Sequence, residues 1–141
     1  MSGICSFTVL LGRILLSTFF IWNGISNLFG LDEAIKLVAG EQLPYASSIA
    51  LGASILEVIG GLSLLIGYKA RFGTILLLIV LIPTTIIFHD FWAQSGDLFH
   101  LHKMMFFKNV SLIGGLLLAL AVGPGKCAFD SKCCSTSSCT H

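Results

Sequence analysis

The stretch SILEVIGGLSLLIG, Ser54 to Gly67, decides the fold. It contains a single acid, Glu57, in an otherwise apolar and small-residue run, and it belongs to a longer run of the same character. Of the 141 residues in the chain, 55% are hydrophobic and only 11% are charged, with a mean hydropathy of +0.94. Soluble domains carry about 25% charged residues. The sequence therefore predicts an integral membrane protein of one compact unit, and its net charge of +1 argues against a nucleic-acid partner.

Four apolar runs approach the length of about 20 residues that a helix needs to cross a bilayer. They cover about residues 7–29, 47–67, 72–88 and 104–122. The loop LDEAIKLVAGEQLPYA predicts a short interfacial helix with Asp32 as N-cap and Gly40 as stop. We predict an all-α, four-transmembrane-helix bundle in residues 1–125 and a flexible, cysteine-rich tail in residues 126–141. The first run lacks the features of a cleavable signal peptide, so we expect it to be a retained span.

Lysine and arginine predict the orientation. Four spans put both termini on one side, and Lys/Arg excess marks the cytoplasmic side. The loop and tail on the side of the termini carry four such residues against two on the other side. They are Lys69, Arg71, Lys126 and Lys132 against Lys36 and Lys103. Both termini are therefore predicted to be cytoplasmic.

A glycine pair recurs in the chain. IGGLSLLIG at Ile59–Gly67 resembles IGGLLLALAVG at Ile113–Gly123, which fits either two helical hairpins in a parallel repeat or chance in a small apolar alphabet. Close backbone approach drives helix association in lipid, so these pairs are expected to form grooves for neighbouring helices. The four glycines are Gly60, Gly61, Gly114 and Gly115.

Pro83 interrupts the third run. Proline removes one helical hydrogen bond, so we expect a kink there. Thr84 and Thr85 follow directly, and their hydroxyls are expected to satisfy part of the freed backbone.

Glu57 lies near the middle of the second run, where a charge costs about 2.5–3.5 kcal/mol on insertion scales. Arg13 lies at a similar depth in the first run, about 10–15 Å from the same face. We therefore expect Glu57 to face Arg13, because a guanidinium can form two parallel hydrogen bonds with a carboxylate. Such a pair either fixes which helices meet or forms a proton- or redox-linked site. In the other arrangement, Arg13 snorkels to the headgroups and Glu57 is protonated.

A second polar set is predicted near the opposite face. It consists of Asn23, His89, Lys108 and Asn109. Together these side chains fit a quinone or anion site, and they equally fit plain helix joining. His100 and His102 form H-x-H in the third loop. With His89 they fit a metal site, although interfacial histidines without metal are the commoner case.

The tail KCAFDSKCCSTSSCTH differs in composition from the rest. Its thiolates suit Cu(I), zinc or an iron–sulfur centre, although the spacing is not a standard zinc pattern. S-acylation, thiol exchange or an unstructured thiol-rich segment fit as well. The candidate metal ligands are Cys127, Cys133, Cys134, Cys139 and His141.

Four segments, in this order, resemble the DoxX family of small membrane proteins: GRILLSTFFIWNGISNLFG, LEVIGGLSLLIGYKAR, FHDFW and FFKNVSLIGGLLLALAVGPG. The resemblance covers roughly residues 8–130 and implies a four-helix bundle of the bacterial inner membrane. The family's polar pattern falls on Arg13, Gly24, Glu57, Gly67, His89, Lys108 and Asn109, with Asn27 where a lysine often stands. Arg13, Glu57, His89 and Lys108 are the implied catalytic candidates.

Two functions follow from these residues and the resemblance. The first is the membrane subunit of a quinone- or thiol-linked redox complex, with quinone as cofactor and either a soluble redox partner subunit or further copies of itself as partner. The second is a non-enzymatic membrane scaffold or small transporter without catalytic activity of its own.

Overall fold

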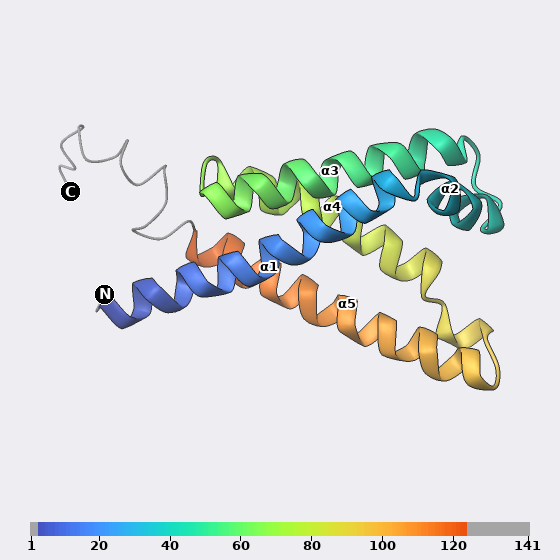
Figure 1. The fold of residues 1–141 in the computed structure, drawn as a ribbon. Coiled ribbons are helices and arrows are strands. Elements are labelled where there is room, and N and C mark those ends of the chain that lie inside the picture. Colours follow the sequence, from blue (N-terminus) through green and yellow to red (C-terminus); the bar gives the residue numbers. More distant parts are fainter. Residues whose placement is uncertain (1–2, 124–141) are drawn as a thin grey trace.

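The computed structural model describes residues 3–123, and helices account for nearly all of them (Figure 1). No strand is present in this part of the chain. The elements are α1 (Gly3–Phe29), α2 (Leu31–Gly40), α3 (Ala46–Ile66), α4 (Ala70–Phe88), the 3-10 turn η1 (Phe91–Ala93) and α5 (Asp97–Val122). The all-α prediction is confirmed.

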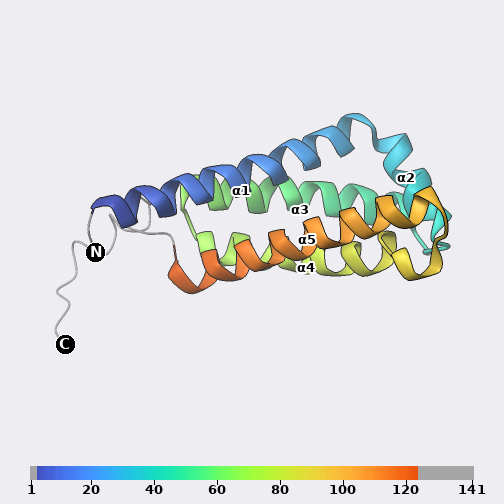
Figure 2. The same cartoon turned by 90° about the horizontal axis from the view of Figure 1, so that it is seen from below.

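Four stretches of the described residues are long and apolar enough to cross a membrane, as predicted. They are Phe7–Phe29, Ala46–Ile66, Ala70–Ala93 and Asp97–Val122. Figures 1 and 2 show the four long helices running along one another, with the start of α1 and the end of α5 at one end and α2 at the other. The α4–α5 hairpin diverges from α1 and α3 toward the α2 end (Figure 1).

Two boundaries differ from the sequence-based expectation. Helix α2 begins at Leu31 with Gly30 in the N-cap position, so Asp32 lies in the first turn, where its charge still favours the helix dipole. Helix α5 begins at Asp97, seven residues before the predicted start of the fourth span at 104. These seven residues, DLFHLHK, form about two helical turns, but they mix polar and apolar side chains and so do not belong to a continuous apolar run.

Helix α3 occupies the centre because it packs against α1, α2 and α4. Two adjacent glycines on α3 face different neighbours. A Cβ on Gly60 would lie 3.0 Å from the Gly73 carbonyl of α4, and one on Gly61 would lie 3.2 Å from the Ile21 nitrogen of α1. Small residues therefore bring three backbones together, as expected for helices in lipid.

Helix α5 is the most loosely packed span, since only Asn109 and Leu116 are buried along its 26 residues. A Cβ on Gly115 would touch Leu16 at 3.2 Å, whereas one on Gly114 would meet nothing within 4 Å. The expectation of a neighbouring helix thus holds for Gly60 and Gly61, holds weakly for Gly115, and fails for Gly114 within the described chain.

Pro83 lies inside α4, and the two threonines after it bond differently from the prediction. Thr84 donates to the Val80 carbonyl at 2.7 Å and Thr85 to the Leu81 carbonyl at 2.6 Å. The carbonyl freed by Pro83 belongs to Ile79, four residues before it. Each hydroxyl instead donates to the carbonyl four residues before its own residue. Neither hydroxyl therefore bonds the Ile79 carbonyl that Pro83 leaves without a backbone partner.

Candidate functional site

Glu57 faces α1 in the interior of the bundle. Glu57 is 8% exposed, and Asn23 Nδ2 donates a hydrogen bond to its Oε2 at 2.8 Å. Gly24 makes this contact possible, because a Cβ there would lie 2.8 Å from the Ser54 carbonyl of α3. The carboxyl group is thus held by an amide across a close approach of α1 and α3.

Arg13 joins the same two helices at another level. It is 3% exposed; Nε donates to the Leu64 carbonyl at 3.0 Å and Nη2 to the Leu65 carbonyl at 2.9 Å. Both carbonyls belong to the last turn of α3, where a helix leaves its C=O groups without internal partners. A cation there also complements the negative end of the helix dipole. Arg13 therefore caps α3.

The predicted Arg13–Glu57 pair is wrong. Glu57 and Leu64 are seven residues apart on α3, which is about 10 Å along the axis. Similar depth in the membrane suggested the pair, but the C-terminal carbonyls of α3 lie at the level of Arg13. Both charges point into the bundle as expected, and each has a different partner.

The predicted set of Asn23, His89, Lys108 and Asn109 does not form one hydrogen-bonded group in residues 3–123. Asn23 bonds Glu57. Lys108 is exposed, with Nζ 5.4 Å from the centre of the Phe19 ring and 3.5 Å from Met105 Sδ. Asn109 is 4% exposed. The His89 ring lies 6.1 Å from the His102 ring, centre to centre.

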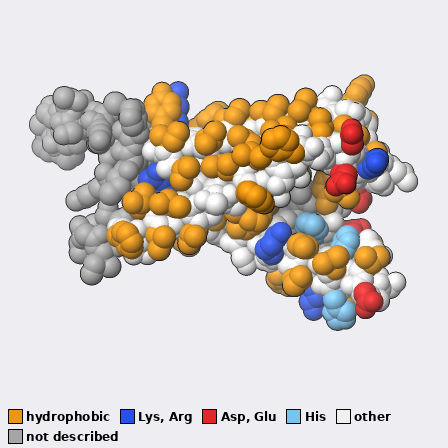
Figure 3. All heavy atoms as spheres, in the orientation of Figure 1, with side chains coloured by type: hydrophobic (Ala, Val, Ile, Leu, Met, Phe, Trp, Pro, Cys, Tyr) orange, Lys and Arg blue, Asp and Glu red, His pale blue; other side chains and the backbone are white. Residues whose placement is uncertain are grey.

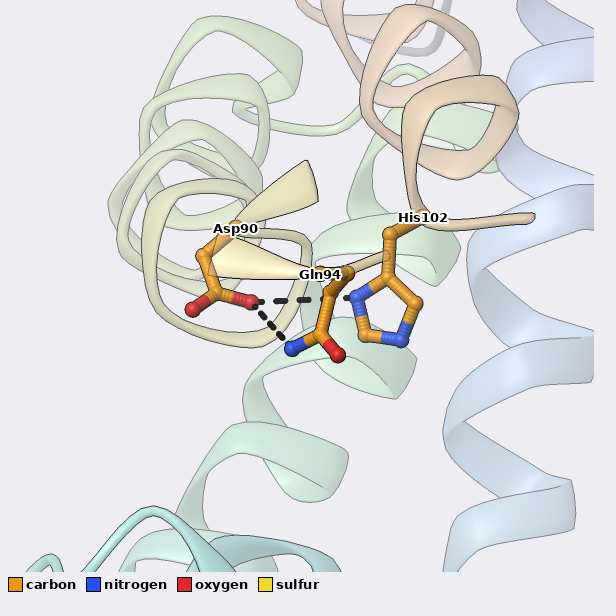
Figure 4. Close-up of polar contacts among 3 residues, drawn as sticks. All are labelled: Asp90, Gln94 and His102. Atoms are coloured by element: carbon orange, nitrogen blue, oxygen red, sulfur yellow. Dashed lines mark hydrogen bonds and ion pairs between the residues drawn. The ribbon is translucent and has the colours of Figure 1, made fainter. Parts of the chain in front are cut away.

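Asp90 forms a polar cluster with Gln94 and His102 (Figure 4). Asp90 follows His89 at the end of the third span, but the sequence did not predict that these three side chains meet. Gln94 Nε2 donates to Asp90 Oδ1 at 3.2 Å, and the same oxygen lies 3.8 Å from His102 Nδ1. That nitrogen is buried without a hydrogen bond in the described chain. The i,i+4 spacing of Asp90 and Gln94 was the available signal. The group can position an imidazole beside a carboxylate at the membrane surface.

Metal binding has no support from the described residues, since no three His, Cys, Asp or Glu side chains converge there. His100 and His102 share the first turns of α5, and the ring of His100 packs on Phe99. The tail candidates Cys127, Cys133, Cys134, Cys139 and His141 lie outside residues 3–123. Their proposed metal or thiol chemistry, and the division at residue 125, stay predictions.

A groove of about 280 Å³ lies between α1 and α5 at the end that carries the α3–α4 loop. We call it the α1–α5 groove. Its lining is apolar except for Arg13 and Thr8, and small residues form much of it. The lining residues are Thr8, Val9, Gly12, Arg13, Leu16, Gly115, Leu118, Ala119, Val122 and Gly123.

Charged residues mark the two ends of the bundle. Acidic side chains gather over α2, and histidines with further acidic side chains gather over the η1–α5 segment, as Figure 3 shows on one face. The opposite end carries Lys69, directly before α4, and Arg71 in the first turn of α4. Two polar ends separated by apolar helices are the pattern of a multi-pass membrane protein.

Comparisons with known proteins give two kinds of relative. The Escherichia coli inner membrane proteins YphA and YqjF are 28% and 30% identical, and the matches cover 88% and 86% of this chain and 89% and 88% of theirs. The Saccharomyces cerevisiae ER-derived vesicles protein ERV29 is 35% identical over 55% of this chain but only 25% of its own length. No solved structure matches the chain.

The resemblance to DoxX proteins is wrong, and with it the redox-complex function and the oxidoreductase assignment. The segments that suggested it are short and apolar, and Gly-Gly among leucines serves helix packing in any membrane protein. The model of the SURF4 family matches residues 6–134, nearly the whole chain. The chain therefore belongs to the SURF4 family.

Proposed function

We propose that the chain is a non-enzymatic membrane scaffold, which binds a helix of another membrane protein against α5. This proposal rests on the hydrogen-bond partners of the two buried charged side chains. Arg13 caps α3 and Glu57 accepts from Asn23, so both charges fasten α1 to α3. A charge used in this way stabilises the arrangement of helices. Fixing which helices meet, and in which register, is the best-attested role of buried polar contacts.

The outward face of α5 is the surface available to the partner. Five residues at helical spacing are exposed on it, and we call them the α5 stripe: Phe107, Val110, Gly114, Leu117 and Ala121. Gly114 costs about 1 kcal/mol of helix stability relative to alanine. Within the described chain nothing packs into the space that it leaves. A second helix lying on Gly114 would offset that cost, because glycine lets two backbones approach.

The relatives support a membrane role of this kind. YphA and YqjF are inner membrane proteins, so we assign this chain to the bacterial inner membrane. The yeast relative's name connects it with ER-derived vesicles, which fits a membrane scaffold better than an electron-transfer subunit. We further propose that both termini are cytoplasmic, because Lys69 and Arg71 lie at the end where α1 starts.

Site-specific photo-crosslinking in native membranes tests the scaffold. A photoreactive phenylalanine analogue is placed at Phe107, Val110 or Leu117 of the α5 stripe. The controls are Ile55 and Ile59, which are also exposed and apolar but lie on α3. We expect one protein adduct of the same mass from all three α5 positions and none from the controls. Adducts of twice the chain's mass would identify the partner as a second copy. Equal adducts from both helices, or lipid adducts alone, would refute the proposal.

A further inference from the structure

The α1–α5 groove has an α5 wall of three small residues. Gly115 and Ala119 share one face of α5, and Gly123, the C-cap residue, follows at the same spacing of four. Eight residues separate the first from the last, which makes this wall about 12 Å long. At Gly115 the groove is closed by Leu16, since a Cβ there would lie 3.2 Å from Leu16 Cδ2.

Arg71 stands at the other end of the groove. A Cβ on Gly123 would lie 3.4 Å from Arg71 Nη2 and 3.6 Å from Nε. The Arg71 side chain is exposed, and within residues 3–123 it has neither a hydrogen bond nor an ion pair. Arg13 lines the groove from α1. The acidic residues of the described chain, Glu57 apart, lie near α2, η1 and the start of α5. The mouth of the groove is therefore electropositive.

We propose that the α1–α5 groove binds one phospholipid with an anionic headgroup. One acyl chain lies along the small-residue wall, and the phosphate meets the Arg71 guanidinium. The apolar lining selects a lipid over a free phosphate, because a soluble anion gains nothing from the groove. Basic pockets between transmembrane helices are a recurrent site for anionic lipid headgroups.

Charge argues against a second copy in the same place. Two copies related by a two-fold axis along the membrane normal would present the same patch to each other. Both Arg71 side chains would then lie at one depth, and like charges repel. An anionic lipid meets the same cation with the opposite sign.

Native mass spectrometry of the purified full chain, after exchange into detergent with added lipid, tests the site. Phosphatidylglycerol is compared with phosphatidylcholine. We expect one phosphatidylglycerol to be retained per chain, and Arg71→Ala or Arg71→Gln to weaken its retention about fivefold. Lys69→Ala is the matched control: Lys69 lies two residues before Arg71, but none of its atoms is among those closest to Gly123, so its loss should change retention less than twofold.

A second pair of variants tests the groove itself. Gly12→Leu fills it from an exposed position where a Cβ meets nothing within 4 Å, and it should abolish retention. Gly52→Leu, where a Cβ likewise meets nothing within 4 Å but which lies on α3 outside the groove, should leave retention unchanged. The site is refuted by equal retention of the two lipids, by equal losses in Arg71→Ala and Lys69→Ala, or by retention in Gly12→Leu. A lipid-free dimer in place of the lipid-bound chain also refutes it.

Discussion

Replacing Gly73 with alanine should separate α4 from α3. A Cβ on Gly73 would lie 2.6 Å from both Cβ and Oγ of Ser63, and 2.9 Å from the Gly60 carbonyl oxygen. Ordinary van der Waals contact begins at 3.4 Å, so the helices must part by 0.5 to 0.8 Å, the differences from 2.9 and 2.6 Å. The Gly60 carbonyl is backbone and cannot move without its helix.

Three terms set the size of the effect. Overpacking of this kind costs about 1–3 kcal/mol. Alanine recovers about 1 kcal/mol of helix propensity. Displacing Ser63 breaks its hydrogen bond to the Tyr68 carbonyl, now 2.7 Å long, for a loss of about 1 kcal/mol. The net prediction is a loss of about 1–3 kcal/mol in the free energy of unfolding.

Equilibrium unfolding in mixed micelles, followed by far-ultraviolet circular dichroism, measures this change. Gly12→Ala is the matched control, because its Cβ meets nothing within 4 Å and only the propensity term applies. Gly60→Ala should behave like Gly73→Ala, and the double variant should lose less than the sum because both open the same interface. Equal unfolding free energies for Gly73→Ala and Gly12→Ala would show that α3 and α4 do not approach as described.

Three further predictions concern the polar contacts and the orientation. A double-mutant cycle of Asn23→Ala and Glu57→Ala should give a coupling of about 0.6–1.7 kcal/mol, and zero coupling would contradict the contact. Arg13→Leu should lower the unfolding free energy by about 1–3 kcal/mol by uncapping α3, with Arg13→Lys intermediate; an unchanged Arg13→Leu would exclude the cap. In a cysteine-free background, an impermeant maleimide should label Ser95→Cys in intact cells and Tyr68→Cys only after permeabilisation, and the reverse pattern would invert the topology.

The spans were predictable because the thickness of the bilayer sets the number of consecutive apolar residues that a membrane-crossing helix needs. The second span, expected at 47–67, is Ala46–Ile66, and the third, expected at 72–88, is α4 at Ala70–Phe88. The start of α5 was not predictable in this way. Its first turn lies at the polar end of the bundle, where helix formation no longer requires apolar residues.

The candidate site was predictable only in part, because sequence position gives depth but not direction. Arg13 and Glu57 point inward, as the cost of charge in hydrocarbon requires. Their partners depend on rotation about each helix axis, which Gly24 and Gly61 set through close contacts with the neighbouring helix. The carbonyls of Leu64 and Leu65 have no sequence signature at all, since every helix ends with such groups.

The glycine pairs show why short apolar motifs indicate where helices pack but do not identify the protein family. On α3, Gly60 and Gly61 each meet a neighbouring helix, so both are used inside the chain. On α5 the same motif uses Gly115 against Leu16 and leaves Gly114 open. One pattern thus supports a central helix in one place and an uncovered surface in the other. A glycine permits close approach without requiring it, so the open space at Gly114 becomes a contact only if the proposed partner helix lies on α5.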